Sequence, residues 1–277
     1  MLGAIAYSLL TRMDIAVFVG ALQRHSQKPK NIHAKRLNAV VKWAKRNPMK
    51  LFYESYSTVS NEPVVTHLRQ YSDAAFKKEE QSGHCMRGAC YLRCPGSDFK
   101  DFTVSAKCHI IEQIARQQRR VVRATFTAEL YGGCDTQDKG FLLAQMLHEC
   151  MTGDTTSSTA RNLRDHGGYV VPMVLYLDAL SVYAAVTATF VKTPAENSAL
   201  FHFKFVRELL DRNVPKAIIW VDTRDMIADG LTKGTIDRAL LHSVMNGYAP
   251  LEKDYKMWHP KLKPTEPAVA GNNDQEE

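Results

Sequence analysis

The sequence contains few cysteines, no CxxC pair and no long uninterrupted apolar run. Six cysteines among 277 residues are too few for a disulfide-stapled scaffold, which predicts reduced thiols and an intracellular, cytoplasmic or nuclear protein. The charged start and short apolar stretch typical of a signal peptide are also missing. Residues 1–22 are rich in apolar side chains, but Arg12 and Asp14 interrupt them. Each such charge would cost about 3 kcal/mol at the centre of a spanning helix, so we expect two packed helical pieces and no membrane anchor.

The cysteines and neighbouring histidines do not have the spacing of a structural zinc site. The possible ligands are His84, Cys85, Cys90, Cys94, Cys108 and His109. Structural zinc sites typically contain a closely spaced cysteine pair, which these residues do not form. We therefore expect buried thiols on neighbouring strands, with zinc binding as the alternative.

The composition is that of a folded, basic protein. A hydrophobic content of 45% and a charged content of 23% allow one substantial core and exclude a fully disordered chain. The formal net charge of +7 makes a polyanionic partner plausible. The charge is uneven, because residues 1–50 hold ten lysines and arginines and only one acidic residue, Asp14.

Two basic segments are candidates for contacts with nucleic acid. In residues 33–46, apolar side chains recur at helical spacing, which predicts an amphipathic helix whose basic positions include Lys35, Arg36 and Lys42. The second segment contains Arg116, Arg119, Arg120 and Arg123. Each segment is either a solvated basic face or a surface that contacts phosphates, and the sequence leaves both interpretations open.

The hydrophobic pattern predicts an α/β fold. Strands are expected at residues 64–71, 88–94, 102–115 with a bend near Cys108, 170–177 and 217–221. Helices are expected at residues 33–46, 125–147, 198–210 and 226–245. This order predicts a mixed five-stranded sheet with flanking helices. The polar residues 57–63 indicate a boundary, so we expect a basic helical segment (1–60), an α/β domain (61–247) and a flexible tail (248–277).

Four acidic residues fall at the ends of these elements. Asp73 and Asp178 follow strands, Glu129 lies early in a helix, and Asp229 lies early in the last helix. They are about fifty residues apart, so only a tertiary fold could gather them. Clustered carboxylates repel one another unless cations neutralise them, and Mg²⁺ prefers carboxylate oxygen. The set is typical of two-metal phosphodiester hydrolysis, whereas a single acid at a strand end usually caps a turn.

Near the last strand, Asp222 and Asp225 could compete with Asp229 as the fourth acid. Asp225 lies in a turn, where a short acidic side chain most often caps a helix, and we expect it to be structural. Asp229 would lie in the first turn of the following helix, whose dipole favours a carboxylate. We therefore predict that Asp229 completes the site.

The segments around these acids resemble the four acidic motifs of the ribonuclease H domain that closes copia-type (LTR) retrotransposon polyproteins. The matching strings are Tyr71-Ser72-Asp73-Ala74, Thr127-Ala128-Glu129-Leu130-Tyr131, Leu175-Tyr176-Leu177-Asp178 and Ala228-Asp229-Gly230-Leu231-Thr232-Lys233. Residues 3–7, 11–16 and 33–48 resemble the end of the reverse transcriptase and its connection in the same polyproteins. The resemblance covers about residues 1–247.

This resemblance implies a ribonuclease H-like fold and hydrolysis of RNA in an RNA/DNA hybrid. Asp73, Glu129, Asp178 and Asp229 would hold two Mg²⁺ ions, or Mn²⁺. The partners would be the hybrid and the upstream reverse transcriptase region, with no membrane, and the setting would include a retrotransposon particle.

Some positions differ from the family pattern. The family usually has proline at Met13, asparagine at Ala179 and a Trp-Lys pair at Glu112-Gln113. No role transfers to His202, because the histidine-containing stretch is altered. The alternative is therefore a catalytically inactive or domesticated module that binds nucleic acid or supports assembly. Four clustered negative charges would repel a polyanion, which argues against a protein that only binds one.

Overall fold

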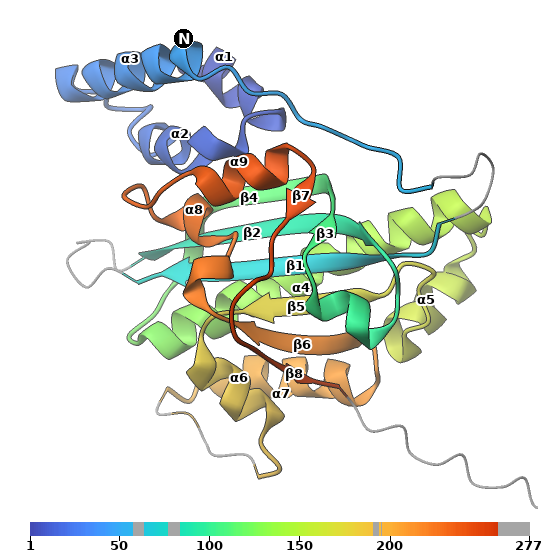
Figure 1. Ribbon diagram of the computed structural model, residues 1–277. Coiled ribbons are helices and arrows are strands. Elements are labelled where there is room, and N and C mark those ends of the chain that lie inside the picture. The colour runs from blue at the N-terminus through green and yellow to red at the C-terminus, as the bar shows by residue number, and fades with distance from the viewer. Residues whose placement is uncertain (58–63, 77–83, 191–193, 195, 260–277) are drawn as a thin grey trace, which may run out of the picture.

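The protein folds around a mixed β-sheet. The computed structural model describes residues 1–57, 64–76, 84–190, 194 and 196–259. Within these residues the main sheet has six strands in the order β4-β2-β1-β5-β6-β8 (Figure 1). Its strands are β1 (Thr66–Ala75), β2 (His84–Pro95), β4 (His109–Val121), β5 (Met173–Leu177), β6 (Pro215–Val221) and β8 (Tyr255–Trp258). A short antiparallel pair joins β3 (Ala106–Lys107) to β7 (Tyr248–Ala249).

The sheet combines an antiparallel half with a parallel half. Strands β1, β2 and β4 are antiparallel neighbours, whereas β5 runs parallel to β1 and β6 runs parallel to β5. Strand β8 pairs antiparallel with β6 at the other edge. The carboxyl ends of β1 and β5 therefore meet at the same end of the sheet.

Helices cover both faces of this sheet. Those of the main body are α4 (Thr125–Thr152), α5 (Ser157–His166), α6 (Leu180–Thr187), α7 (Ala199–Asp211), α8 (Asp229–Thr232) and α9 (Ala239–Met245). Helices α4 to α7 contribute to the cores on one face. Helices α8 and α9 pack on the other face, together with the 3-10 turn Phe99–Thr103. The predicted α/β class is confirmed.

Strand β5 shows why the central strands are apolar along their whole length. All five of its residues are buried. Val174 and Tyr176 pack in the core beneath α8 and α9, and Leu175 and Leu177 pack in the core beneath α4 and α7. Alternate side chains of a strand point to opposite faces, so a sheet covered on both sides needs apolar residues at every position.

The N-terminal segment lies beyond the β4 edge of the sheet, next to α9 (Figure 1). It contains α1 (Leu2–Tyr7), 3-10 turns at Ser8–Leu10 and Met13–Ile15, α2 (Ala16–Gln23) and α3 (Asn31–Arg46). Arg12 and Asp14, the charges that interrupt the apolar stretch, form a two-pronged ion pair at 2.9 and 2.8 Å. Asp14 is fully buried. None of the helices in the described ranges is long and apolar enough to cross a bilayer.

The expected elements differ from the observed ones in several places. The third strand, expected at 102–115, is instead a 3-10 turn, the short β3 and the long β4. The closing helix expected at 226–245 is split into α8 and α9, and a 3-10 turn (Thr223–Asp225) precedes them. Arg238 donates to the carbonyls of Gly230 and Lys233, and these bonds hold the bend between the two helices. Helices α5 and α6 were not expected.

The end of the chain also departs from expectation. A flexible tail was expected from residue 248, but residues 248–249 form β7 and residues 255–258 form β8, which makes the sheet six-stranded where five strands were expected. Residues 260–277 of that expected tail lie outside the described residues. The thiols of Cys85, Cys90, Cys94 and Cys108 are buried in the cores on or beside β2, as expected.

Candidate active site

The central acid, Asp73, lies near the carboxyl end of β1 and is almost fully buried. It pairs across the sheet with Gly88 of β2. A Cβ atom at Gly88 would lie 2.8 Å from the carbonyl oxygen of Ala228 and 2.9 Å from side-chain atoms of Leu231 and Thr232. Glycine at this position therefore lets α8 approach the sheet closely enough to face Asp73.

Asp178 reaches the same place through the register of the parallel strands. Ser72 of β1 pairs with Leu177 of β5. Asp73 is the residue after Ser72 in β1, and Asp178 is the residue directly after the end of β5. The two carboxylates therefore lie side by side at the end of the sheet. Asp229 comes from the first residue of α8, a helix that follows β6 through a 3-10 turn.

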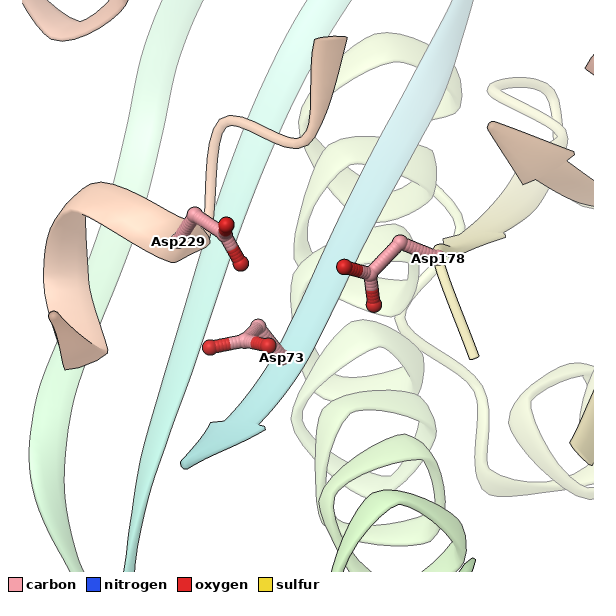
Figure 2. Close-up of side chains that lie close together, drawn as sticks. All are labelled: Asp73, Asp178 and Asp229. Atoms are coloured by element: carbon pink, nitrogen blue, oxygen red, sulfur yellow. The ribbon is translucent and has the colours of Figure 1, made fainter. Parts of the chain in front are cut away.

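The three aspartates point toward one another (Figure 2). One carboxylate oxygen from each of Asp73, Asp178 and Asp229 lies within 4.8 Å of the others. Asp73 and Asp229 are buried, and Asp178 is half-buried at the open side. Three of the four acids predicted from the sequence are thus gathered in one cluster, which we call the aspartate cluster.

The electrostatics of the cluster reflect mutual repulsion in a poorly solvated place. Burial, and then the neighbouring Asp73, raise the pKa of Asp178 to about 6. The same two causes raise the pKa of Asp229 to about 7, although Lys233 opposes them. A carboxylate that titrates this far above its usual range is one whose negative charge has too few compensating partners.

Glu129, the fourth predicted acid, lies behind the aspartate cluster in the first turns of α4. Its Oε2 accepts a hydrogen bond from the backbone N–H of Ala74 at 3.1 Å. Burial, followed by the charges of Asp73 and Asp178, raises the pKa of Glu129 far above its usual range. Glu129 therefore adjoins the aspartates without joining their set of mutually close oxygen atoms, and its role as a ligand remains a prediction.

Two residues that the sequence analysis did not assign also belong to the site. The Thr232 hydroxyl donates to Oδ2 of Asp73. The Lys233 ammonium lies 2.6 Å from Oδ1 of Asp229 and 3.5 Å from Oδ1 of Asp73. The spacing from Asp229 to Lys233 is four residues, the spacing of neighbours on a helix, and this could have indicated an ion pair.

The donor set fits a hard divalent cation. It consists of carboxylate oxygens from three different segments, gathered where Asp178 remains partly accessible. Mg²⁺ and Mn²⁺ favour such oxygen donors and keep several waters. The ammonium of Lys233 already lies against two of the aspartates, so the cluster binds positive charge in this structure.

Asp222 and Asp225 take no part in the aspartate cluster. Asp222 accepts hydrogen bonds from the backbone and side chain of Arg224 and so begins the 3-10 turn. Asp225 is structural, as predicted, but it is not a helix cap. Its Oδ2 accepts the backbone N–H groups of Glu252 and Lys253 at 2.8 and 2.6 Å, which fixes the segment between β7 and β8.

The basic residues predicted to bind nucleic acid are exposed, but they lie on different surfaces. Lys35, Arg36 and Lys42 are on α3, which has no buried residue. Arg116 and Arg120 lie on the α4 side of the sheet. Arg116 pairs across the sheet with Arg87, which forms an ion pair with Asp135 of α4, and Arg120 lies over Tyr131 of α4. Arg119 is exposed near the end of β4. Arg123 is exposed just beyond the end of β4.

Arg120 has partners of its own on the α4 side. Its guanidinium contacts Nε2 of His202 and lies over the Tyr131 ring, 5.2 Å from the ring centre. These contacts give Arg120 and His202 a packing role between β4, α4 and α7, away from the aspartate cluster.

A groove of about 600 Å³ opens beside the aspartate cluster. Asp229 lies on its wall, together with residues of α9 and of the segment that joins β7 to β8. Arg224 and Lys253 contribute positive charge to the lining, and Asp225, Asp237 and Glu252 contribute negative charge. Asp229 is the member of the aspartate cluster that lines this depression, which carries both signs of charge.

Comparison with known proteins gives structural neighbours only. No protein-family model matches the sequence, and no curated protein matches it. The chain is similar to the structure of a ribonuclease H1 isolated from compost by a metagenomic approach, with a TM-score of 0.36 and 12% identity, over 63% of this chain and 98% of that one. It is also similar to prototype foamy virus protease-reverse transcriptase, with a TM-score of 0.30 and 10% identity, over 76% of this chain and 26% of that one.

Proposed function

We propose that this protein hydrolyses the RNA strand of RNA/DNA hybrids with the help of divalent cations. The observation that carries the proposal is the aspartate cluster, in which β1, β5 and α8 each supply one carboxylate to the same end of the sheet. These three segments are distant in the sequence, and each brings its acid within a motif that resembles the ribonuclease H domain of copia-type polyproteins.

The chemistry of the cluster favours phosphodiester hydrolysis over simple binding. A protein that only binds a polyanion gains nothing from acids that repel both one another and the phosphates. Bound to these carboxylates, two divalent cations, Mg²⁺ or Mn²⁺, would supply an activated water and neutralise the charge that develops on the leaving 3′ oxygen. Asp73, Asp178 and Asp229 would hold them, with Glu129 as the fourth acid.

The remaining residues would orient the site and the substrate. Thr232 fixes the rotamer of Asp73 through its hydroxyl, and the Ala74 N–H fixes Glu129. Arg119, which is exposed near the end of β4, would contact a phosphate. Hybrid recognition would depend on A-form shape, phosphates and 2′-hydroxyls, because side chains read little base sequence in such a duplex.

The biological setting belongs to the same proposal. The resemblance of residues 3–7, 11–16 and 33–48 to the end of a reverse transcriptase makes an upstream polymerase region the expected partner, within an LTR retrotransposon polyprotein. A domesticated, inactive module that binds nucleic acid is the alternative, and it is favoured by the departures at Ala179 and Glu112-Gln113.

A cleavage assay on a labelled RNA/DNA hybrid tests the proposal. We expect cleavage with MgCl₂ or MnCl₂ and none with EDTA. Asp178→Asn should reduce the rate by at least about 100-fold, because it removes a cation ligand, and should leave the fold intact. Asp229→Asn should do the same. The matched control is Asp211→Asn, which changes an exposed acid at the end of α7.

The outcomes separate the two candidate functions. Cleavage by Asp178→Asn at the wild-type rate would refute the proposed site. A wild-type protein that binds the hybrid but does not cleave it under any of these conditions would instead favour the binding module.

A further inference from the structure

Lys233 is the only cation that forms ion pairs with the aspartate cluster among the described residues. Its ammonium lies 2.6 Å from Oδ1 of Asp229 and 3.5 Å from Oδ1 of Asp73. The two aspartate side chains are only 6% and 1% exposed, whereas the lysine side chain is 35% exposed. The lysine therefore approaches two buried acids from the solvent side.

The backbone and the side chain of Lys233 are held very differently. The N–H of Lys233 donates to the carbonyl of Asp229 at 2.8 Å, and its carbonyl accepts from Arg238 at 2.8 Å. The backbone is thus fixed at the end of α8. The side chain is a flexible four-carbon stem whose ammonium bonds to the two aspartates, so the ammonium can swing toward water without moving the helix.

A divalent cation and this ammonium require the same oxygen atoms. A cation held by the aspartate cluster would use oxygens of Asp73 and Asp229, and both Oδ1 atoms face the ammonium. The second oxygen of Asp73 is already bound by the Thr232 hydroxyl. Two positive charges at this spacing would also repel each other strongly in a partly buried place.

We propose that the Lys233 ammonium is an internal counter-ion that a divalent cation displaces from Asp73 and Asp229. This inference rests on the proposed function, because it takes the aspartate cluster to be a cation site. In the metal-free protein Lys233 holds the acids in their gathered positions. When a cation binds, the ammonium, whose side chain is already 35% exposed, moves out into water, so Lys233 is a positioning residue that competes with the metal.

The first test compares Lys233→Met with Lys204→Met, which changes an exposed lysine on α7. We expect Lys233→Met to lower the melting temperature in EDTA, where nothing else neutralises the acids. Saturating MgCl₂ should restore the melting temperature of the variant. The variant's dissociation constant for Mg²⁺, measured by calorimetry, should be lower than that of the wild type by about tenfold, because the competing ammonium is gone. Lys204→Met should match the wild type, and Lys233→Arg should keep most of the metal-free stability.

A second test follows the wild-type lysine directly and does not depend on a folded variant. The rate at which an amine-reactive acylating reagent labels Lys233 is measured by mass spectrometry with and without MgCl₂. We expect slow labelling in EDTA, because the ammonium is held in ion pairs, and labelling at least about fivefold faster with Mg²⁺, the lower end of typical coupling effects. Labelling of Lys204 should be the same in both.

Failure of the inference is distinguishable from failure of the proposed function. If the wild type binds Mg²⁺ but Lys233→Met has an unchanged dissociation constant, or is destabilised equally with and without Mg²⁺, the displacement is refuted while the cation site stands. Labelling of Lys233 that does not change with Mg²⁺ has the same meaning. If the wild type binds no Mg²⁺ at all, both the displacement and the proposed metal-dependent function are refuted.

Discussion

Strand β1 carries a buried cation near one end and a buried acid near the other, on the same face of the sheet. Arg69 and Asp73 are four residues apart, and their exposed fractions are 0% and 1%. Tyr71 lies between them and stacks on Tyr176 of β5, with ring centres 4.5 Å apart. The two charges are equally buried, but their surroundings differ completely.

Arg69 is held by three fixed acceptors. Its guanidinium donates to the backbone carbonyls of Asp101 and Val104 at 2.7 and 2.9 Å and to Nε2 of His67 at 3.0 Å. The His67 ring in turn bonds the carbonyl of Gly96 through Nδ1. Burial, followed by the charge of Arg69, lowers the pKa of His67 to about 4, so the ring is neutral and can accept from the arginine.

Asp73, in contrast, is surrounded by other acids. Two side chains at the end of α8 compensate its charge, those of Thr232 and the half-buried Lys233. Its other charged neighbours are the carboxylates of the aspartate cluster. Fixed backbone carbonyls solvate a charge permanently and make it structural. Carboxylates that face one another, balanced by one movable cation, leave a demand for positive charge that a ligand can meet. The surroundings therefore distinguish a buried charge that holds the fold together from one that is available for chemistry.

The largest effect should come from removing the structural charge. Arg69→Met keeps most of the side-chain length but leaves the carbonyls of Asp101 and Val104 without a donor, and we expect the free energy of unfolding to fall by about 3 kcal/mol. Urea denaturation measures this decrease. Arg161→Met, at an exposed position on α5, should change stability by less than about 0.5 kcal/mol. Cleavage per folded molecule should be unchanged, and a stable but inactive Arg69→Met would contradict the distinction between the two ends.

Asp225 tests whether a buried acid with backbone donors behaves like Arg69. It is 4% exposed and accepts two backbone N–H groups. Asp225→Ala should cost about 2 kcal/mol of unfolding free energy, because both donors lose their partner, and should leave most of the cleavage activity. Asp225→Asn, which retains one acceptor oxygen, should cost less. A large decrease in activity with unchanged thermal stability would place Asp225 with the aspartate cluster after all.

The pH dependence of the metal-free protein should report the uncompensated acids. The pKa of Asp178 is raised to about 6 in the folded protein, so the folded state binds more protons than the unfolded state between pH 4 and 6. Stability in EDTA should therefore fall as the pH rises through this window, with Asp178 contributing on the order of 1–2 kcal/mol.

Other groups titrate in the same window, and His67, with its lowered pKa, acts in the opposite direction. The quantity to measure is therefore the difference between the wild type and Asp178→Asn from pH 4 to 8. We expect the variant to gain stability relative to the wild type as the pH rises. MgCl₂ should remove that gain, and a difference that does not vary with pH would contradict mutual repulsion within the aspartate cluster.

The smallest effect should come from exposed charges, which water solvates, unlike the buried Arg69 and Asp73 of β1. The double variant Lys35→Gln/Lys42→Gln on α3 should weaken hybrid binding. It should also flatten the plot of the logarithm of the binding constant against the logarithm of the salt concentration, by about 0.9 in slope for each phosphate that is no longer neutralised. Lys204→Gln serves as the control. An unchanged slope would make α3 a bystander. Point substitutions are needed because deletion of residues 1–50 would also remove Met13 and Ala16 from the core beneath α8 and α9.

Patterns within single segments were enough to predict most of the local elements and to identify the acids. Continuous apolar character predicted the doubly covered strand β5, and helical spacing predicted α3. These features are readable because they depend on the periodicity of neighbouring side chains. Asp178 follows its strand as expected, whereas Asp73 lies within β1, which continues to Ala75 where the prediction ended the strand at residue 71. Helices α5 and α6 were missed, and so was the break between α8 and α9, which depends on hydrogen bonds from Arg238.

Which charges meet depends on contacts between segments that are far apart in the chain. The pairing of Ser72 with Leu177 places Asp73 beside Asp178, and the absence of a side chain at Gly88 admits α8 with Asp229 and Lys233. Nothing in the local sequence distinguishes buried Arg69, whose partners are carbonyls of a distant turn, from an exposed arginine. The pairing of β8 with β6 likewise turned an expected tail into an edge strand. Register and close packing join residues far apart in the chain, and no pattern confined to one segment contains that information.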